Sequence, residues 1–227
     1  MFFHVNAIMS DTENTTSTAA ADTDAPVRKR PKPGERRGQI LQALASMLEQ
    51  PGAERVTTAA LAARLDVSEA ALYRHFASKA QMFEGLIEFI EQTVFTLVNQ
   101  IIDREAASGA TPAEIGVRQV TRIVTMLMQF GEKNPGMTRV MVGDALVYEN
   151  ERLQQRMNQF FDKIEASFKQ CLRPVAEASG SASPTLDAQV RASVLTAFSA
   201  GRLQRFARSG FKRAPSEQLD LSLQQIL

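Results

Sequence analysis

The segment 56–79, VTTAALAARLDVSEAALYRHFASK, constrains the fold more than any other part of the chain. Leu61 and Leu65 lie on one face of a first short helix, and Leu72 and Phe76 turn inward from a second one that ends in the string LYRHF. A tight turn joins these two helices. The segment therefore predicts a helical corner whose apolar faces pack against neighbouring helices.

Hydroxyl side chains stand at the expected start of each short helix. Thr57 or Thr58 is placed to cap the first helix and Ser68 the second, because a side-chain oxygen at an N-cap accepts a hydrogen bond from a free backbone N–H. Asp66-Val67 forms the turn between them. Glu69, Ala70, Tyr73 and Arg74 are then left near or on the outer face of the second helix. This layout is typical of a helix-turn-helix whose second helix enters the major groove of DNA.

The string Leu-Tyr-x-His-Phe-x-x-Lys at 72–79, together with the apolar helix before it, resembles the DNA-binding domain of the TetR family over residues 33–95. The resemblance implies an all-α fold, with an N-terminal three-helix helix-turn-helix domain and a C-terminal helical dimerisation domain. Family members commonly have glycine where this chain has Asp66. A turn at this position often needs a positive φ, and aspartate tolerates that conformation better than most residues.

The candidate DNA contacts follow from the motif and the resemblance. Glu69 is suited to accept a hydrogen bond from cytosine and Ala70 to touch a thymine methyl group. Thr57 and Thr58 can reach phosphates or base edges while they cap the first helix, and capping alone is the alternative role for both. His75 has no cysteine or carboxylate at metal-ligand spacing, so a framework or phosphate-contacting role is expected. The full set is Arg36, Arg37, Thr57, Thr58, Ser68, Glu69, Ala70, Tyr73, Arg74, His75 and Lys79.

Positive charge is concentrated around this motif. Residues 1–27 carry four acidic residues and no lysine or arginine, whereas residues 28–80 carry ten basic and five acidic residues. Residues 81–227 carry sixteen of each. A protein that neutralises DNA phosphates requires such a local excess of positive charge. The alternative is that the basic residues at 28–37 form only a solvated, flexible tail.

Composition narrows the function classes. Cys171 is the only cysteine, which excludes an intrachain disulfide, fits a reducing cytoplasm and indicates a small apolar residue on a helix. No apolar run approaches the roughly 18 residues of a membrane span, and no signal peptide is evident whether the start is Met1 or Met9. Nucleophile elbows, phosphate-binding glycine loops and metal-binding histidine pairs are missing from the sequence. We therefore expect a cytoplasmic protein without catalytic activity, cofactor or metal.

Three regions are expected along the chain: 1–33, a disordered acidic and then basic arm; 34–80, the DNA-binding domain; and 81–227, a helical dimerisation and partner-binding domain. The first helix is expected over 34–48, ended by Pro51-Gly52, and a capping box opens the helix at Thr111. Gly131 ends that helix before a polar turn at 132–136. The expected helices of the third region cover 79–104, 112–130, 137–148, 151–172 (ending before Pro174), 184–208 and 216–227.

The helix at 184–208 carries apolar and small residues at helical spacing, which permits close approach of another helix. Together with the last helix it is suited to a four-helix dimer interface, and burial inside one monomer is the alternative. Dimerisation also fits palindromic DNA, because two recognition helices must lie about one turn, roughly 34 Å, apart. The candidate interface residues are Val190, Val194, Ala197, Phe198 and Gly201.

Strings at 86–91, 130–166 and 205–212 resemble one branch of the TetR family, which acts in nucleoid occlusion. This resemblance implies a homodimer on double-stranded DNA, with higher-order assembly there, that engages the division protein FtsZ and prevents ring assembly over the chromosome. Phe89, Lys133 and Asn134 are the candidate FtsZ contacts, with burial of Phe89 in the core as its alternative. The other functions to be weighed are a repressor released by a hydrophobic small molecule, although no ligand is identified, and a helical interaction protein that does not bind DNA.

Overall fold

The computed structural model describes residues 34–50 and 56–227, and all regular structure within these ranges is helical. The expected arm at 1–33 and the expected helix stop at Pro51-Gly52 lie outside the described residues. The predicted all-α fold is confirmed. The elements are α1 (Glu35–Leu48), α2 (Thr58–Arg64), α3 (Glu69–Tyr73), α4 (Lys79–Ala106), α5 (Pro112–Lys133), α6 (Pro135–Met141), the short 3-10 helix η2 (Asp144–Leu146), α7 (Glu151–Ala178), α8 (Pro184–Arg208) and α9 (Leu219–Ile226).

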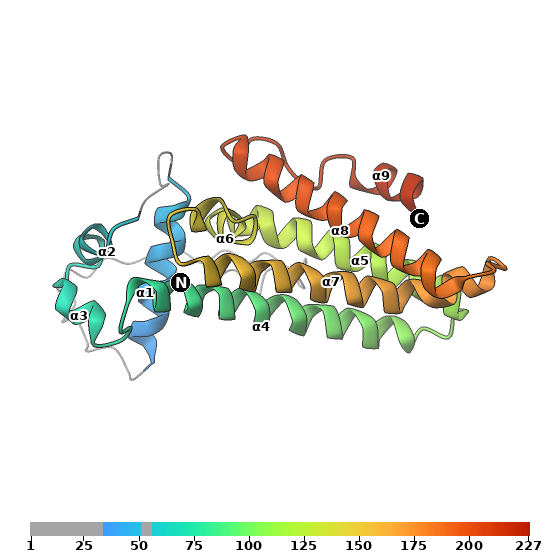
Figure 1. Ribbon diagram of the computed structural model, residues 1–227, viewed down its shortest axis with the longest axis horizontal. Coiled ribbons are helices and arrows are strands. Elements are labelled where there is room, and N and C mark those ends of the chain that lie inside the picture. The colour runs from blue at the N-terminus through green and yellow to red at the C-terminus, as the bar shows by residue number, and fades with distance from the viewer. Residues whose placement is uncertain (1–33, 51–55) are drawn as a thin grey trace, which may run out of the picture.

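The three short N-terminal helices lie at one end of the molecule, and the long helices α4, α5, α7 and α8 extend away from them (Figure 1). Their facing sides are apolar and fully buried, as at Val94 of α4, Leu127 of α5 and Phe160 of α7. Helix α4 begins against the N-terminal helices and continues through the C-terminal body, so it connects the two parts of the protein.

Two glycines of α5 allow neighbouring helices to approach closely. A Cβ at Gly116 would overlap the carbonyl oxygen of Cys171 on α7. A Cβ at Gly131 would lie 2.5 Å from Cδ2 of Leu203 on α8. The expectation that Gly131 ends the helix was therefore wrong: α5 continues to Lys133, and the glycine is needed for packing rather than for a helix stop.

Three further boundaries differ from the sequence-based expectations. Helix α6 covers only Pro135–Met141, since Gly143 takes φ +84° and breaks the helix that was expected to reach Tyr148. Helix α7 continues through Pro174, and its last turns bury Ala176 in the core. Helix α9 begins at Leu219 rather than at 216, because the preceding Gln218 has a left-handed backbone conformation, with φ 52°. The bounds predicted for α8 are confirmed.

Helix α6 connects the C-terminal body to α1. A Cβ at Gly136 would overlap the carbonyl oxygen of Ala45 in α1, so the two backbones are in direct contact there. Nearby, an Arg139 guanidinium N–H donates to the carbonyl oxygen of Leu48 over 3.2 Å. The position of α1, and with it that of α2 and α3, is therefore coupled to the body through α6 as well as through α4.

Candidate nucleic-acid interface

The capping residues of the short helices are confirmed. The hydroxyl of Thr57 accepts from the N–H of Ala60 over 3.2 Å, and the hydroxyl of Ser68 accepts from the N–H of Ala71 over 3.3 Å. Thr58 has a different partner, because its hydroxyl donates to a carboxylate oxygen of Glu69 over 2.6 Å. This bond joins the first turns of α2 and α3 and holds the Glu69 carboxylate on the outer surface.

The turn between α2 and α3 depends on a positive φ at one residue. Asp66 takes φ 54°, as expected for a position where relatives commonly have glycine. The N–H of Asp66 donates to the carbonyl of Ala63, and the N–H of Val67 donates to that of Ala62, each over 3.1 Å. These two bonds form a Schellman motif, which satisfies the last carbonyls of α2 and directs the chain into α3.

The outer face of α3 is open to solvent. Leu72 and Phe76 are buried beneath it, as predicted, whereas Tyr73 is 45% exposed. The helix itself ends at Tyr73, earlier than the expected end at Phe76, because Arg74 caps it and the chain turns at His75. The candidate base and phosphate contacts that share this exposed face are Glu69, Ala70, Tyr73, Arg74 and His75.

The basic residues around the motif have specific partners. The guanidinium of Arg37 donates to the carbonyl oxygen of His75 over 2.8 Å and lies 4.1 Å from the centroid of the Phe76 ring, which fixes α1 against the end of α3. Arg36 donates to Gln39 within α1. Lys79, a candidate DNA contact at the start of α4, forms an ion pair with Glu149 in the C-terminal body.

The three candidate FtsZ contacts differ in exposure. Lys133 is exposed at the end of α5, while Phe89 is partly buried and packs against the core. Asn134 is only 9% exposed, and its side-chain amide donates to the carbonyl of Phe130 over 2.9 Å. The expected polar turn at 132–136 was therefore wrong, since Asn134 is both the C-cap of α5 and the N-cap of α6. It lies at a buried junction of α5 and α6, where its amide satisfies a helix-end carbonyl.

The candidate dimer residues form an open stripe on α8. Val190 and Val194 are 55% and 48% exposed, Ala197 is exposed, and Phe198 and Gly201 are half-buried. Burial inside one monomer is thus contradicted for Val190, Val194 and Ala197, whereas Phe198 packs in part against the core of its own chain. Leu186, which the sequence-based prediction missed, lies one helical turn before Val190 and is also exposed, so the same four-residue spacing identifies it.

Three other features of the described residues bear on function: the single cysteine, possible metal ligands and possible membrane spans. Burial raises the pKa of the Cys171 thiol to about 11, which fits the expected apolar role. No group of three or more possible metal ligands occurs among the described residues. Within the same ranges, no helix is both long enough and apolar enough to cross a membrane.

Comparison with known proteins reveals relatives along most of the chain. Residues 40–86 match the bacterial regulatory proteins of the tetR family, and residues 116–227 match the SlmA-like group of tetracyclin repressor-like C-terminal domains. The nucleoid occlusion factor SlmA of Aliivibrio fischeri is 48% identical over 191 residues, which are 84% of this chain and 93% of the relative. SlmA of Idiomarina loihiensis is 48% identical over 83% of this chain and 92% of its own length.

Solved structures with low sequence identity share the fold. The fatty acid degradation regulator FadR from Bacillus halodurans aligns with a TM-score of 0.67 at 15% identity, over 86% of this chain and 96% of that one. The TetR family regulator PfmR from Thermus thermophilus aligns with a TM-score of 0.63 at 20% identity, over 83% and 97% of the two chains.

Proposed function

This chain belongs to the TetR family of bacterial regulatory proteins and, within it, to the nucleoid occlusion factors called SlmA, and we propose that its DNA-bound homodimer antagonises FtsZ ring assembly over the chromosome. In this role the protein associates with the nucleoid in the cytoplasm and coordinates cell division with chromosome segregation. The observation that carries the proposal is the exposed outer face of α3, in a chain 48% identical to a nucleoid occlusion factor.

For DNA recognition, α3 enters the major groove with its outer face toward the bases. Thr58 holds the carboxylate of Glu69 in place through their 2.6 Å hydrogen bond, so that Glu69 is oriented to accept from cytosine. Tyr73 and Arg74 reach the phosphates and the groove edge. Two copies of α3 in a homodimer then read the two halves of a palindromic site.

For FtsZ binding, we retain Lys133 and Phe89 as contact residues and assign Asn134 a positioning role. Lys133 immediately precedes the α5–α6 junction, and α6 packs backbone to backbone against α1 of the DNA-binding domain. The FtsZ-binding corner and the DNA-binding helices are thus mechanically connected. This connection supports a protein whose action on FtsZ depends on bound DNA.

DNA binding is tested by fluorescence anisotropy with a duplex recovered from a genome-wide map of bound sites. Arg74→Ala is expected to weaken binding and to reduce the salt dependence by about one counterion, because one phosphate contact is lost. Tyr73→Ala is expected to weaken binding to a similar extent on every duplex, because a phosphate contact positions the protein without reading the sequence. Melting temperatures should change little, because both side chains are exposed. Arg208→Ala, at an exposed arginine in the last turn of α8, is the matched control.

Unchanged affinity for both variants would contradict the assignment of the recognition helix. A wild-type protein without salt-dependent affinity for any duplex would instead be a helical interaction protein. Bound palindromes that are dispersed over the chromosome and depleted near the replication terminus would support nucleoid occlusion, whereas one or two bound promoters would support a repressor.

FtsZ antagonism is tested by light scattering of FtsZ polymers with the DNA-bound protein. Wild-type protein on its specific duplex should reduce scattering, and Phe89→Ala and Lys133→Gln should restore it while DNA affinity is retained. Lys212→Gln, another exposed lysine, is the matched control. If saturating specific DNA gives no effect on FtsZ, the proposal fails.

A ligand-responsive repressor is the second candidate function, and a groove between α4 and α5 favours it. This groove has a volume of about 300 Å³, and Leu97, Ile101 and Met126 line it together with Arg104 and Arg122. A hydrophobic acid would suit such a lining. Release of DNA by medium-chain fatty acids, with loss of this response in Met126→Lys, would support the repressor over the division inhibitor.

A further inference from the structure

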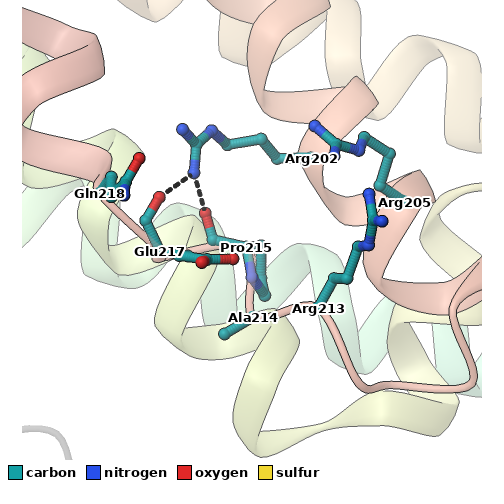
Figure 2. A pocket seen from close by; sticks show the side chains of 7 residues that line it. All are labelled: Arg202, Arg205, Arg213, Ala214, Pro215, Glu217 and Gln218. Carbon is teal, nitrogen blue, oxygen red and sulfur yellow. Dashed lines mark hydrogen bonds between the residues drawn. The ribbon is translucent and has the colours of Figure 1, made fainter.

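A second concentration of positive charge lies in the connection between α8 and α9, where the candidate DNA contacts do not reach. A cavity of about 550 Å³ opens there (Figure 2). Three arginines and one glutamate give its lining a net charge of +2. The lining residues are Arg202, Arg205, Arg213, Ala214, Pro215, Glu217 and Gln218.

Arg202 builds the wall of this cavity. Its guanidinium donates to the carbonyl oxygens of Pro215 and Glu217 over 2.8 and 2.7 Å, and to the hydroxyl of Ser222 over 2.7 Å. Figure 2 shows the first two of these bonds fixing the loop opposite α8. Burial, and next the nearby charge of Arg205, lower the pKa of Arg202. The cavity therefore holds like charges close enough to interact unfavourably.

Arg205 and Arg213 are the two cations of the lining that remain available to bind an anion. Arg205 extends from α8 and Arg213 from the loop, and both line the same cavity (Figure 2). Within the described ranges, no ion pair or side-chain hydrogen bond is made by either guanidinium. Glu217 is the one carboxylate of the lining, so it neutralises only part of the charge. An anion between Arg205 and Arg213 would remove this repulsion.

We propose that this cavity binds a phosphorylated small molecule with at least two negative charges, held by Arg205 and Arg213. A guanidinium offers two parallel N–H donors that match a phosphate group, and charge-assisted bonds of this kind are among the strongest in proteins. The volume falls within the range of small-molecule sites, and the lining is polar rather than apolar. Glu217 supplies an acceptor for a hydroxyl or amino group of the same ligand.

The site is connected to the rest of the molecule by the loop that forms its floor. The N–H and the hydroxyl of Ser216 donate to one carboxylate oxygen of Glu132, over 3.0 and 2.5 Å. Glu132 lies in the last turn of α5, directly before Lys133. Occupation of the cavity is therefore linked to the α5–α6 corner that packs on α1.

Isothermal titration calorimetry of the full chain with pyrophosphate tests the site. Wild-type protein should bind pyrophosphate, and the double variant Arg205→Gln/Arg213→Gln should bind it at least tenfold more weakly. Arg208→Gln, an exposed arginine of the same last turn of α8 outside the lining, should stay within twofold of wild type. Pyrophosphate should also raise the melting temperature of wild-type protein and not that of the double variant. Without ligand, the double variant should melt close to wild type, because the guanidinium groups of Arg205 and Arg213 that it lacks make no hydrogen bond or ion pair within the described part of the wild-type protein.

Absence of pyrophosphate binding to the wild type, or equal binding by the wild type and the double variant, would overturn the proposal. A double variant that loses affinity for duplex DNA, while the wild type binds no pyrophosphate, would make the two arginines a DNA phosphate contact instead. If the double variant loses pyrophosphate binding but keeps its DNA affinity and its effect on FtsZ, the anion site is supported and the function proposed above is unaffected. The two proposals can therefore be refuted independently.

Discussion

The contact between α6 and α1 makes Gly136 a sensitive probe of how the DNA-binding helices are held on the body. Gly136→Ala adds a Cβ that overlaps the carbonyl oxygen of Ala45 and lies 2.9 Å from its carbonyl carbon. Both neighbours are backbone atoms, so no side chain can rotate out of the way. The contact with the carbonyl oxygen is the shorter one and sets the displacement. Because real Cβ atoms essentially never come within 3.0 Å of another heavy atom, the two helices must separate by at least about 1 Å.

The size of the effect follows from this displacement. Overpacking of a buried site costs about 1–3 kcal/mol, and a clash between two backbones belongs at the upper end. The higher helix propensity of alanine offsets up to about 1 kcal/mol. The net loss is then about 2 kcal/mol in the free energy of unfolding, which lowers the melting temperature by roughly 4–8 °C for a chain of this size. DNA affinity should also fall, because α1 positions α2 and α3.

Thermal unfolding followed by circular dichroism, at one fixed protein concentration, measures the change. Gly38→Ala is the matched control, since it lies in the interior of α1 with no atom within 4 Å of the added Cβ. It should stabilise the protein by about 0.5–1 kcal/mol, through reduced freedom of the unfolded chain. The two glycine variants are thus expected to shift the melting temperature in opposite directions. A Gly136→Ala protein as stable as wild type would refute the backbone contact between α1 and α6.

Three other predictions concern the body. Charges at Val190 and Val194 should convert the dimer to a monomer in sedimentation equilibrium, and a persisting dimer of Val190→Asp/Val194→Asp would place the interface elsewhere. Thr111→Ala should cost about 1 kcal/mol in urea unfolding at pH 7, because the capping box of α5 is lost. Hydrogen bonds from Thr111 lower the pKa of Glu114. The contribution of Glu114 is therefore fully present above its ordinary value of 4.5 and is lost as the pH falls through the lowered pKa, so the effect of Thr111→Ala should shrink in acid. Finally, Cys171, with its pKa of about 11, should react with a disulfide reagent at pH 8 only after denaturation; rapid reaction of the native protein would contradict its burial.

Local signals predicted much of the fold and of the candidate DNA-binding surface. Thr57, Ser68 and Thr111 cap helices as expected, and Asp66 adopts the positive φ that its turn requires. Each of these features depends on hydrogen bonds or steric limits within a few residues, which a short segment of sequence contains in full. The exposed face of α3 follows for the same reason, because helical periodicity separates it from buried Leu72.

The features that sequence reasoning misjudged depend on neighbours far along the chain. Gly131 was predicted to stop a helix, whereas in the structure it makes room for Leu203 of α8. Asn134 was predicted to lie in a polar turn, whereas in the structure it is buried at the α5–α6 junction. The backbone contact of Gly136 with Ala45 joins residues 91 positions apart. Neither Arg205 nor Arg213 was predicted to belong to a binding site, and only the fold of the α8–α9 connection brings both to one cavity. Periodicity and composition show that a residue is apolar, small or charged, whereas packing of distant helices decides what it touches.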